Sequence, residues 1–398
     1  MSSFSRERLK GIGIWNLAAW LAWTIVLVAI VIHRAKSHSR STLEVYQLAG
    51  SHWTHGEYLY GDRRGFVYSP LAAAFFTILD WLPRAWATVF WLLVNAAALL
   101  GGMWAILRSG FGPAIDRKHF GIAFLLLLPL AIGNLDVMQA NALVIGLLML
   151  AFAAASKERW AVAAVCIGVA TYLKIYPLSV GLLLVLLAPW RFGWRLVVAL
   201  VVLGLLPFLF QHPQYVSDQY HFWIASRLGD NRLQYSEKDA PLDLWYLLVR
   251  VGHVPLTQGA YRILQVLAGG AIAVFEVVGR LRGWPRLRIL AGAFSFVSIW
   301  MTLVGPATEG YTYILLAPAA ALAFVQAWSR PDSKWERGLV SGAMALLLFA
   351  VARNSFMPHL KTPLVMSAQP AGALLLLGAC LTAIRYDAFN SKVADHDR

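Results

Sequence analysis

Residues 133–141 read Gly-Asn-Leu-Asp-Val-Met-Gln-Ala-Asn, and an apolar run lies on each side of them, at 120–132 and 142–155. Four hydrogen-bonding side chains between two runs of near membrane-spanning length are unfavourable unless they face water or a site. Residues 171–177 repeat the arrangement, with Lys174 between two further apolar runs. The sequence therefore predicts polar turns between membrane helices at both places, named here the 133–141 turn and the Lys174 turn.

The composition is that of a polytopic membrane protein. Of 398 residues, 59% are hydrophobic and 14% are charged, whereas soluble domains carry roughly 25% charged residues. The 17 tryptophans fit this class, because Trp favours the membrane–water interface. The net charge of +14 reflects basic residues that flank membrane spans and orient their insertion, so we expect no nucleic-acid partner. Cys166 and Cys380 lie inside apolar runs and predict neither a disulfide framework nor a metal cluster.

The apolar runs predict an all-α integral membrane protein with about 12 transmembrane helices. They are 12–33, 85–108, 119–132, 138–155, 159–172, 175–190, 194–211, 258–279, 287–305, 311–328, 336–353 and 366–385. The first exceeds a signal peptide's core of roughly 7–15 residues and predicts a retained span. A further run, 66–82, is interrupted by Pro70 and Asp80 and is interpreted as a re-entrant or interfacial helix, with a thirteenth span as the alternative. Residues 1–398 then form one membrane domain with two long loops, 34–84 and 212–257.

Basic residues orient this topology. With a cytoplasmic N-terminus and twelve spans, more than half of the 34 Lys and Arg residues fall in inner segments, and every short inner loop is basic. Both termini are then cytoplasmic. The loops 34–84 and 212–257, the 133–141 turn, Lys174 and the turn 305–309 all fall on the outer face. A thirteenth span would reverse the next six spans and remove their charge bias, which favours twelve.

Each polar feature of the outer face has a structural and a functional interpretation. Glu44 is either a solvated loop residue or a general base. The 133–141 turn either joins helices through hydrogen bonds or lines a site. Lys174 either extends to the interface or binds a lipid phosphate. The aromatic and charged side chains of 212–257 suit either a sugar site or an interfacial helix, and Glu309 suits either a helix cap or a site.

Several motifs are missing from the sequence. It has no GxxxxGK phosphate loop, no zinc-type His/Glu helix, no Gly-x-Ser-x-Gly elbow and no cysteine pair, so nucleotide-driven transport and metallohydrolysis have no support. A lipid-linked sugar transporter or flippase is the first rival class, and it predicts ionisable groups at mid-membrane and repeated halves. Charges gathered at one face favour an enzyme instead.

Three sequence blocks carry a resemblance to a known family. They are Val45-Tyr46 with Phe66-Val67-Tyr68-Ser69-Pro70, then Gln139-Ala140-Asn141, then Leu173-Lys174-Ile175-Tyr176-Pro177-Leu178. In order and spacing they resemble glycosyltransferase family 87, over roughly residues 40–210. The resemblance implies a GT-C-type membrane fold with a long first outer loop. It also implies transfer of a hexose, mannose in the family's description, from a polyprenyl-phosphate donor to a lipid or glycan acceptor at the outer face of the cell membrane.

The residues are assigned roles on that basis, with no cofactor and no metal. Lys174, helped by Arg227 or Arg232, is predicted to hold the donor phosphate. The residues predicted to contact the sugar or the acceptor are Tyr46, Tyr68, Gln139, Asn141, Tyr176 and Asp230.

The catalytic base is the departure from the family pattern. The family places an aspartate where this chain has Thr42. Glu44 is the first candidate for the base, because in an extended segment it would point the same way as Thr42. Glu309, Asp136 and Asp230 are alternatives, as is a reaction that needs no base because the phosphate leaves readily. A degenerate family member acting as a partner subunit is the second rival.

Overall fold

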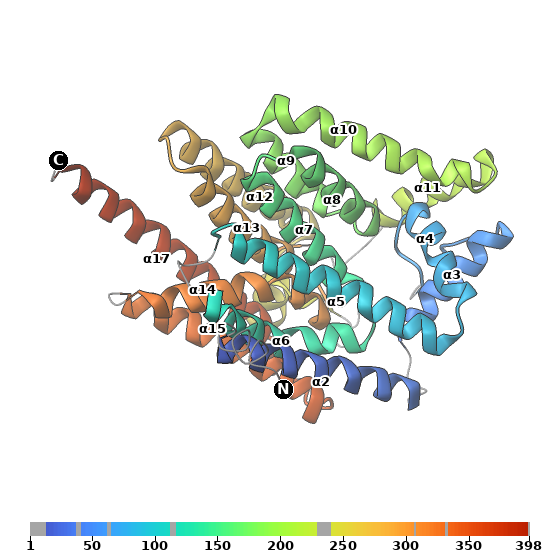
Figure 1. Ribbon diagram of the computed structural model, residues 1–398, viewed down its shortest axis with the longest axis horizontal. Helices are drawn as coiled ribbons and strands as arrows, with labels where there is room; N and C mark the ends of the chain where they lie inside the picture. The colour runs from blue at the N-terminus through green and yellow to red at the C-terminus, as the bar shows by residue number, and fades with distance from the viewer. Residues whose placement is uncertain are drawn as a thin grey trace, which may run out of the picture. The chain divides into compact units, whose positions relative to one another are not determined.

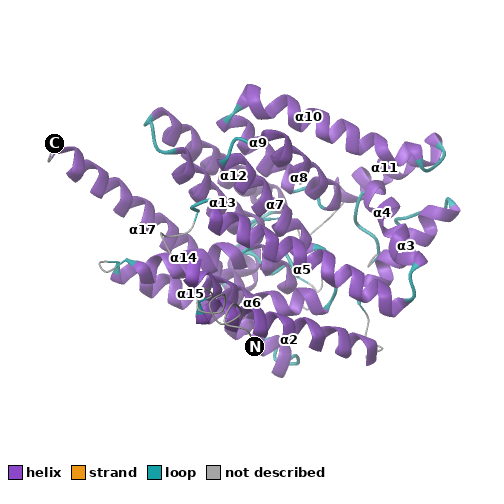
Figure 2. Cartoon of the chain, in the orientation of Figure 1, coloured by secondary structure: helices purple, strands orange, loops and turns teal. Residues whose placement is uncertain are grey.

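The computed structural model describes residues 13–36, 41–61, 65–111, 117–228, 240–305, 308–330 and 333–396. Every regular element among them is helical (Figure 2). The chain divides into two compact units. Unit 1 comprises Met1–Trp23, Leu107–Ala131 and Arg232–Arg398, and unit 2 comprises Thr24–Ile106 and Ile132–Asn231. Helices α2 (Ile14–Lys36), α5 (Arg84–Arg108) and α6 (Phe120–Asp136) contribute residues to both.

The other elements belong to one unit each. Unit 2 holds α3 (Thr42–His55), α4 (Pro70–Trp81), α7 (Asn141–Ser156), α8 (Trp160–Leu173), α9 (Pro177–Leu187), α10 (Pro189–Leu205), η2 (Leu206–Leu209) and α11 (Pro213–Leu228). Unit 1 holds η1 (Arg117–His119), η4 (Tyr246–Val251), α12 (Gln258–Leu281), α13 (Arg286–Leu303), η5 (Gly310–Leu315), α14 (Ala317–Ser329), α15 (Lys334–Phe356), α16 (Pro363–Met366) and α17 (Ala368–His396).

The predicted all-α membrane class is confirmed, and the number of twelve spans stays a prediction. Seven described segments are long and apolar enough to cross a membrane: Ile14–Lys36, Arg84–Arg108, Arg117–Asp136, Pro189–Leu209, Gln258–Leu281, Arg286–Leu303 and Lys334–Phe356. Five shorter apolar helices are α4, α7, α8, α9 and Ala368–Ile384 of α17. The run 311–328 is divided, because η5 precedes α14 and Pro318 lies in the first turn of α14, where proline starts a helix and cannot continue one.

Unit 2 is built around two short helices that are apolar on every side. Most residues of α7 and α8 are buried, as expected for helices surrounded by other helices. Helix α8 packs against α7, α9 and α10 (Figure 1). The backbones of α5 and α7 approach closely, and a side chain at Gly146 would overlap the Ala98 carbonyl group. Small residues permit such contacts between membrane helices.

The loop 34–84 contains two helices that pack on each other, α3 and α4. Gly56 ends α3 with φ +70°, and its N–H points to the carbonyls of His52 and Trp53, a geometry that favours glycine. Helix α4 begins where the Ser69 side chain accepts from the Ala72 N–H, with Pro70 in the first turn, a common start signal.

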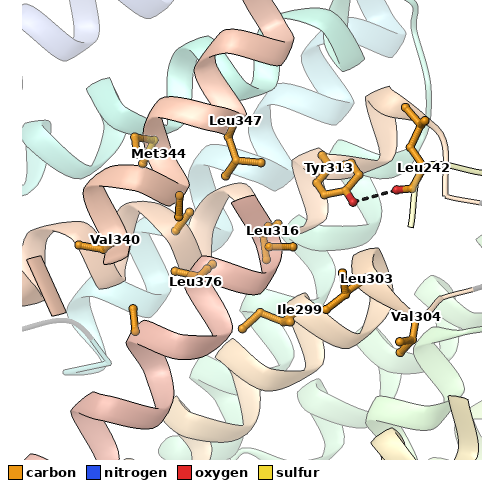
Figure 3. Close-up of a cluster of buried hydrophobic side chains, with 14 of the residues drawn as sticks. Leu242, Ile299, Leu303, Val304, Tyr313, Leu316, Val340, Met344, Leu347 and Leu376 are labelled. Carbon is orange, nitrogen blue, oxygen red and sulfur yellow. Dashed lines mark hydrogen bonds between the residues drawn. The ribbon is translucent and has the colours of Figure 1, made fainter. Parts of the chain in front are cut away.

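Unit 1 has its own apolar core, drawn in Figure 3. Helix α15 lies along α17, and α13 packs on α12 and α17. Figure 3 shows Leu347 of α15, Leu376 of α17 and Leu303 of α13 around this core. The Tyr313 hydroxyl donates to the Leu242 carbonyl oxygen at 2.8 Å, so the short segment before η4 is fastened to η5.

Candidate functional site

The 133–141 turn satisfies most of its own polar groups. The Asn134 side-chain oxygen accepts from the Ala142 N–H at 3.3 Å, which caps the start of α7. The Gln139 side-chain oxygen accepts from the amide nitrogens of Asn141 at 2.8 Å and Asn134 at 3.4 Å. Asn141 is fully buried, and its Oδ1 has no hydrogen-bond partner among the described residues. The turn therefore acts as a helix junction, and Asn141 keeps one buried acceptor for another donor.

Three groups from other segments hold this turn. The Thr42 N–H donates to the Val137 carbonyl at 3.1 Å, the Trp91 ring N–H donates to the Met138 carbonyl at 2.8 Å, and the Ala140 N–H donates to the Tyr46 hydroxyl at 3.1 Å. Met138 itself has φ 61°, an unfavourable conformation for a side chain other than glycine. A strained residue persists only where its surroundings fix it, and these contacts fix it.

Tyr46 and Tyr68 are buried in an aromatic cluster. Their hydroxyls lie 2.8 Å apart, and the two residues are 0% and 4% exposed. The Tyr46 ring stacks on Phe76 at 4.3 Å and meets Trp91 edge-on at 5.2 Å. In this structure the two tyrosines connect the first loop to the 133–141 turn, and neither ring offers an open face to a sugar.

The Lys174 turn is fastened to the same loop. The Ser69 hydroxyl donates to the Tyr172 carbonyl at 2.6 Å. Lys174 ends α8 in an extended conformation, is half-buried, and places its Nζ 6.0 Å from the centre of the Tyr176 ring. The Tyr176 hydroxyl is buried without a hydrogen-bond partner among the described residues.

Helix α11 lies along the first loop and carries Arg227. Its Gln219 side chain accepts from the Leu59 N–H at 3.1 Å, and its Trp223 ring N–H donates to the Val67 carbonyl at 3.3 Å. Burial raises the pKa of the Tyr60 phenol, and the Arg227 guanidinium acts on it in the opposite direction. Arg227 is therefore close to the first loop. Asp230 and Arg232 lie outside the described residues.

The segment 42–44 is helical, which corrects the expectation of an extended chain there. On a helix, positions two apart point about 200° away from each other, so Glu44 does not take the direction of the Thr42 side chain. Glu44 is exposed and pairs with Arg84 at 2.9 Å. Tyr46, two residues after Glu44 in α3, points inward instead.

The alternative carboxylates have structural partners. Glu309 caps η5 through reciprocal bonds with Thr312, the capping arrangement that satisfies free backbone N–H groups. Glu309 belongs to unit 1. Asp136 is bonded by His33 at 2.8 Å and by Arg34 at 2.6 Å. The described part of the chain contains no group of three or more His, Cys, Asp and Glu side chains that could hold a metal ion.

Sequence reasoning missed several residues that organise this region. Asn95 is 2% exposed, donates to the Trp91 carbonyl and accepts from the Leu143 N–H at 3.1 Å. The sequence did carry a signal for Asn95, because an amide inside an apolar run requires a partner. Ser69 was part of the first sequence block, but its role as a helix cap before Pro70 was not predicted. The partnership of Gln219 with the first loop had no local signal.

Comparison with known proteins identifies the family. No curated protein matches the chain. The family described as "Glycosyltransferase family 87" matches residues 66–306, which is more than half of the sequence. The matched region begins later than the expected 40–210, so it omits Thr42, Glu44 and Tyr46, and it extends through α13. It contains Tyr68, the 133–141 turn and the Lys174 turn. The chain belongs to glycosyltransferase family 87.

Proposed function

We propose that this membrane glycosyltransferase moves a hexose, mannose by family resemblance, from a polyprenyl-phosphate donor to a lipid or glycan acceptor. The reaction takes place at the outer face of the cell membrane, and both termini are cytoplasmic. Family membership and the apolar helices support the general statement that the protein is a membrane glycosyltransferase. The donor, the sugar and the sidedness are proposals that rest on the family resemblance and on the distribution of basic residues.

One observation carries the proposal: the three sequence blocks meet in unit 2. Tyr46, from the first block, bonds Ala140 of the second at 3.1 Å. Ser69, also from the first block, bonds Tyr172 beside the third at 2.6 Å. Positioning of donor and acceptor supplies much of the rate of group transfer, and a shared frame for these blocks supports such positioning.

Lys174 is the proposed ligand of the donor phosphate. A half-buried ammonium interacts with an anion more strongly than one in water, because the local dielectric constant is lower. The Tyr176 hydroxyl, buried without a partner among the described residues, would donate a hydrogen bond to a phosphate oxygen. Arg227, on α11, would add a second cation, and Arg232 is proposed from the sequence alone.

In the proposed reaction, the acceptor oxygen forms a bond to the anomeric carbon of the hexose. The bond from that carbon to the phosphate oxygen breaks, and polyprenyl phosphate leaves with the electron pair. Glu44 accepts the hydroxyl proton of the acceptor. Glu44 is exposed and pairs with Arg84 at 2.9 Å, so an acceptor can reach its carboxylate. Gln139 and Asn141, whose side chains bond each other at 2.8 Å, orient the sugar or the first loop.

Transfer of radiolabel from polyprenyl-phosphate-mannose to membrane acceptors tests the donor site. We expect Lys174→Ala to lower transfer about tenfold or more, because one charge-assisted hydrogen bond is worth about 1.5–3 kcal/mol. Lys174→Arg should retain part of it. Lys157→Ala, an exposed lysine after α7, is the matched control. Full transfer by Lys174→Ala would show that Lys174 is not a ligand of the donor phosphate. Movement of the donor across the membrane without sugar transfer would favour a flippase.

The base is tested separately. Glu44→Gln should lower the rate of transfer and leave donor binding unchanged, because the carboxylate acts on the acceptor proton. Arg84→Gln removes the ion-pair partner and keeps the carboxylate, so its effect should be smaller. Equal rates in Glu44→Gln and the unmodified protein would reject Glu44 and favour a reaction without a base.

A further inference from the structure

A cavity of about 620 Å³ lies among the helices of unit 1. Its size falls within the roughly 300–1,000 Å³ of small-molecule sites. Phenylalanines from two helices, Phe275 of α12 and Phe294 of α13, give it an apolar side. Arg288, Arg330 and Glu336 give it a charged side. The cavity therefore has the amphipathic lining that suits a molecule with a polar head and an apolar tail.

The charged side has an excess of positive charge. Arg330 and Glu336 lie 3.7 Å apart, with side chains 24% and 5% exposed, so the carboxylate balances one arginine. Arg288 donates to the Ile384 carbonyl at 3.3 Å, and its guanidinium lies 4.3 Å from the centre of the Trp284 ring. The Nε of Arg288 is buried and makes no hydrogen bond within the described residues. A buried charged donor of this kind is stabilised by an anion or by water.

The helix ends around the cavity share one side of the predicted topology. Helix α13 begins at Arg286, α14 ends at Ser329 and α15 begins at Lys334. The basic loops at these ends, 280–288 and 330–337, are those predicted to face the cytoplasm. Two helix N-termini add partial positive charge there. Basic pockets between membrane helices on the cytoplasmic side commonly bind anionic lipid head groups.

We propose that this cavity binds an anionic glycerophospholipid of the inner leaflet. The phosphate lies between Arg288 and Arg330, where a planar guanidinium can contact two phosphate oxygens. The first part of the acyl chains lies against Phe275 and Phe294. The binding chemistry is that of a phosphate anion, which free phosphate shares. The site uses none of the residues assigned to sugar transfer, so it is a separate lipid site in the same chain.

Binding is measured on delipidated protein in detergent, by native mass spectrometry and by thermal unfolding. The added probes are phosphatidylglycerol, phosphatidylcholine or inorganic phosphate. We expect phosphatidylglycerol alone to be retained and to raise Tm. Removal of each arginine, in Arg288→Gln and Arg330→Gln, should weaken retention about tenfold, the equivalent of one charge-assisted hydrogen bond.

Two further variants keep the test independent of folding defects. Arg282→Gln removes an exposed arginine from the same group of helix ends and should bind like the unmodified protein. Ala291→Phe fills the cavity from α13 and leaves both arginines in place, yet it should lose the lipid. Equal retention of the two lipids, or full retention by Ala291→Phe and Arg288→Gln, would overturn the proposal. An equally large shift with inorganic phosphate alone would overturn the lipid assignment and make a soluble anion the ligand.

Discussion

The Tyr46 hydroxyl connects the first loop to the 133–141 turn, and Tyr46→Phe removes its two hydrogen bonds and keeps the ring. The hydroxyl accepts from the Ala140 N–H at 3.1 Å and lies 2.8 Å from the Tyr68 hydroxyl. Tyr46 and Ala140 are both 0% exposed, so water does not replace the lost oxygen. The ring stays in place against its aromatic neighbours, and no sizeable cavity forms.

The expected loss of stability follows from the polar groups that Tyr46→Phe leaves without a partner. A buried N–H without its acceptor costs about 1–3 kcal/mol, and a lost neutral hydrogen bond adds about 0.5–1.5 kcal/mol. Hydrogen bonds between membrane helices are worth less than this sum, because the unfolded state in the membrane also finds partners. We therefore expect a loss of about 2 kcal/mol. At about 2–4 °C per kcal/mol for a domain of this size, Tm falls by about 4–8 °C.

The assay is thermal unfolding of purified protein in lipid nanodiscs. Tyr58→Phe is the control, since Tyr58 lies in the same loop and is 47% exposed, and its loss should stay within about 0.5 kcal/mol. A double-mutant cycle with Tyr68→Phe isolates the energy between the two hydroxyls. If Tyr46→Phe unfolds at the same temperature as Tyr58→Phe, the hydroxyl does not hold the turn and the reasoning fails.

Three other substitutions test the packing around the site and in unit 1. Gly146→Ala forces α5 and α7 apart and should lower the free energy of unfolding by about 1–3 kcal/mol. Gly101→Ala, the control, places its methyl group in open space and should be neutral or stabilising. Equal effects of the two substitutions would contradict the close contact of α5 and α7. Ser69→Ala removes the cap of α4 and the bond to Tyr172 and should cost about 1–2 kcal/mol and lower sugar transfer; unchanged unfolding would refute this. Glu276→Gln should raise Tm. The Glu276 carboxylate is 1% exposed, and neither of its oxygens has a hydrogen-bond partner in the described residues, so its burial is unfavourable. A lower Tm would mean that the carboxylate makes a stabilising interaction.

The sequence predicted the two polar turns because their signals are local. A run of apolar residues interrupted by Asn, Asp and Gln identifies the junction between α6 and α7, and Lys174 identifies the junction between α8 and α9. The lengths of the helices were harder to predict. Hydropathy alone does not say where a helix breaks, so the run 311–328 became η5 and α14. The segment 42–44 was expected to be extended and is the first turn of α3.

The candidate site residues also differed in how much of their surroundings the sequence predicted. Lys174 and Tyr176 stay predicted site residues, and both predictions come from one short motif. Tyr46 and Tyr68 were predicted from the first block of the family resemblance, but their burial was not predicted, since it depends on Phe76 and Trp91. The cap formed by Glu309 was one of two open interpretations; its bonds with Thr312 show the cap, and a role in the site stays a prediction.

The sequence by itself determined the membrane class, the basic flanks of the predicted inner loops and the family, because hydropathy, charge and motif order are properties of the linear chain. Tertiary structure alone decided which polar groups are partners. Tyr46 bonds a residue 94 positions away, and Ser69 bonds one 103 positions away. The physical reason is that a buried polar group must find a partner wherever the packed helices bring one within about 3 Å, and sequence distance does not constrain that choice.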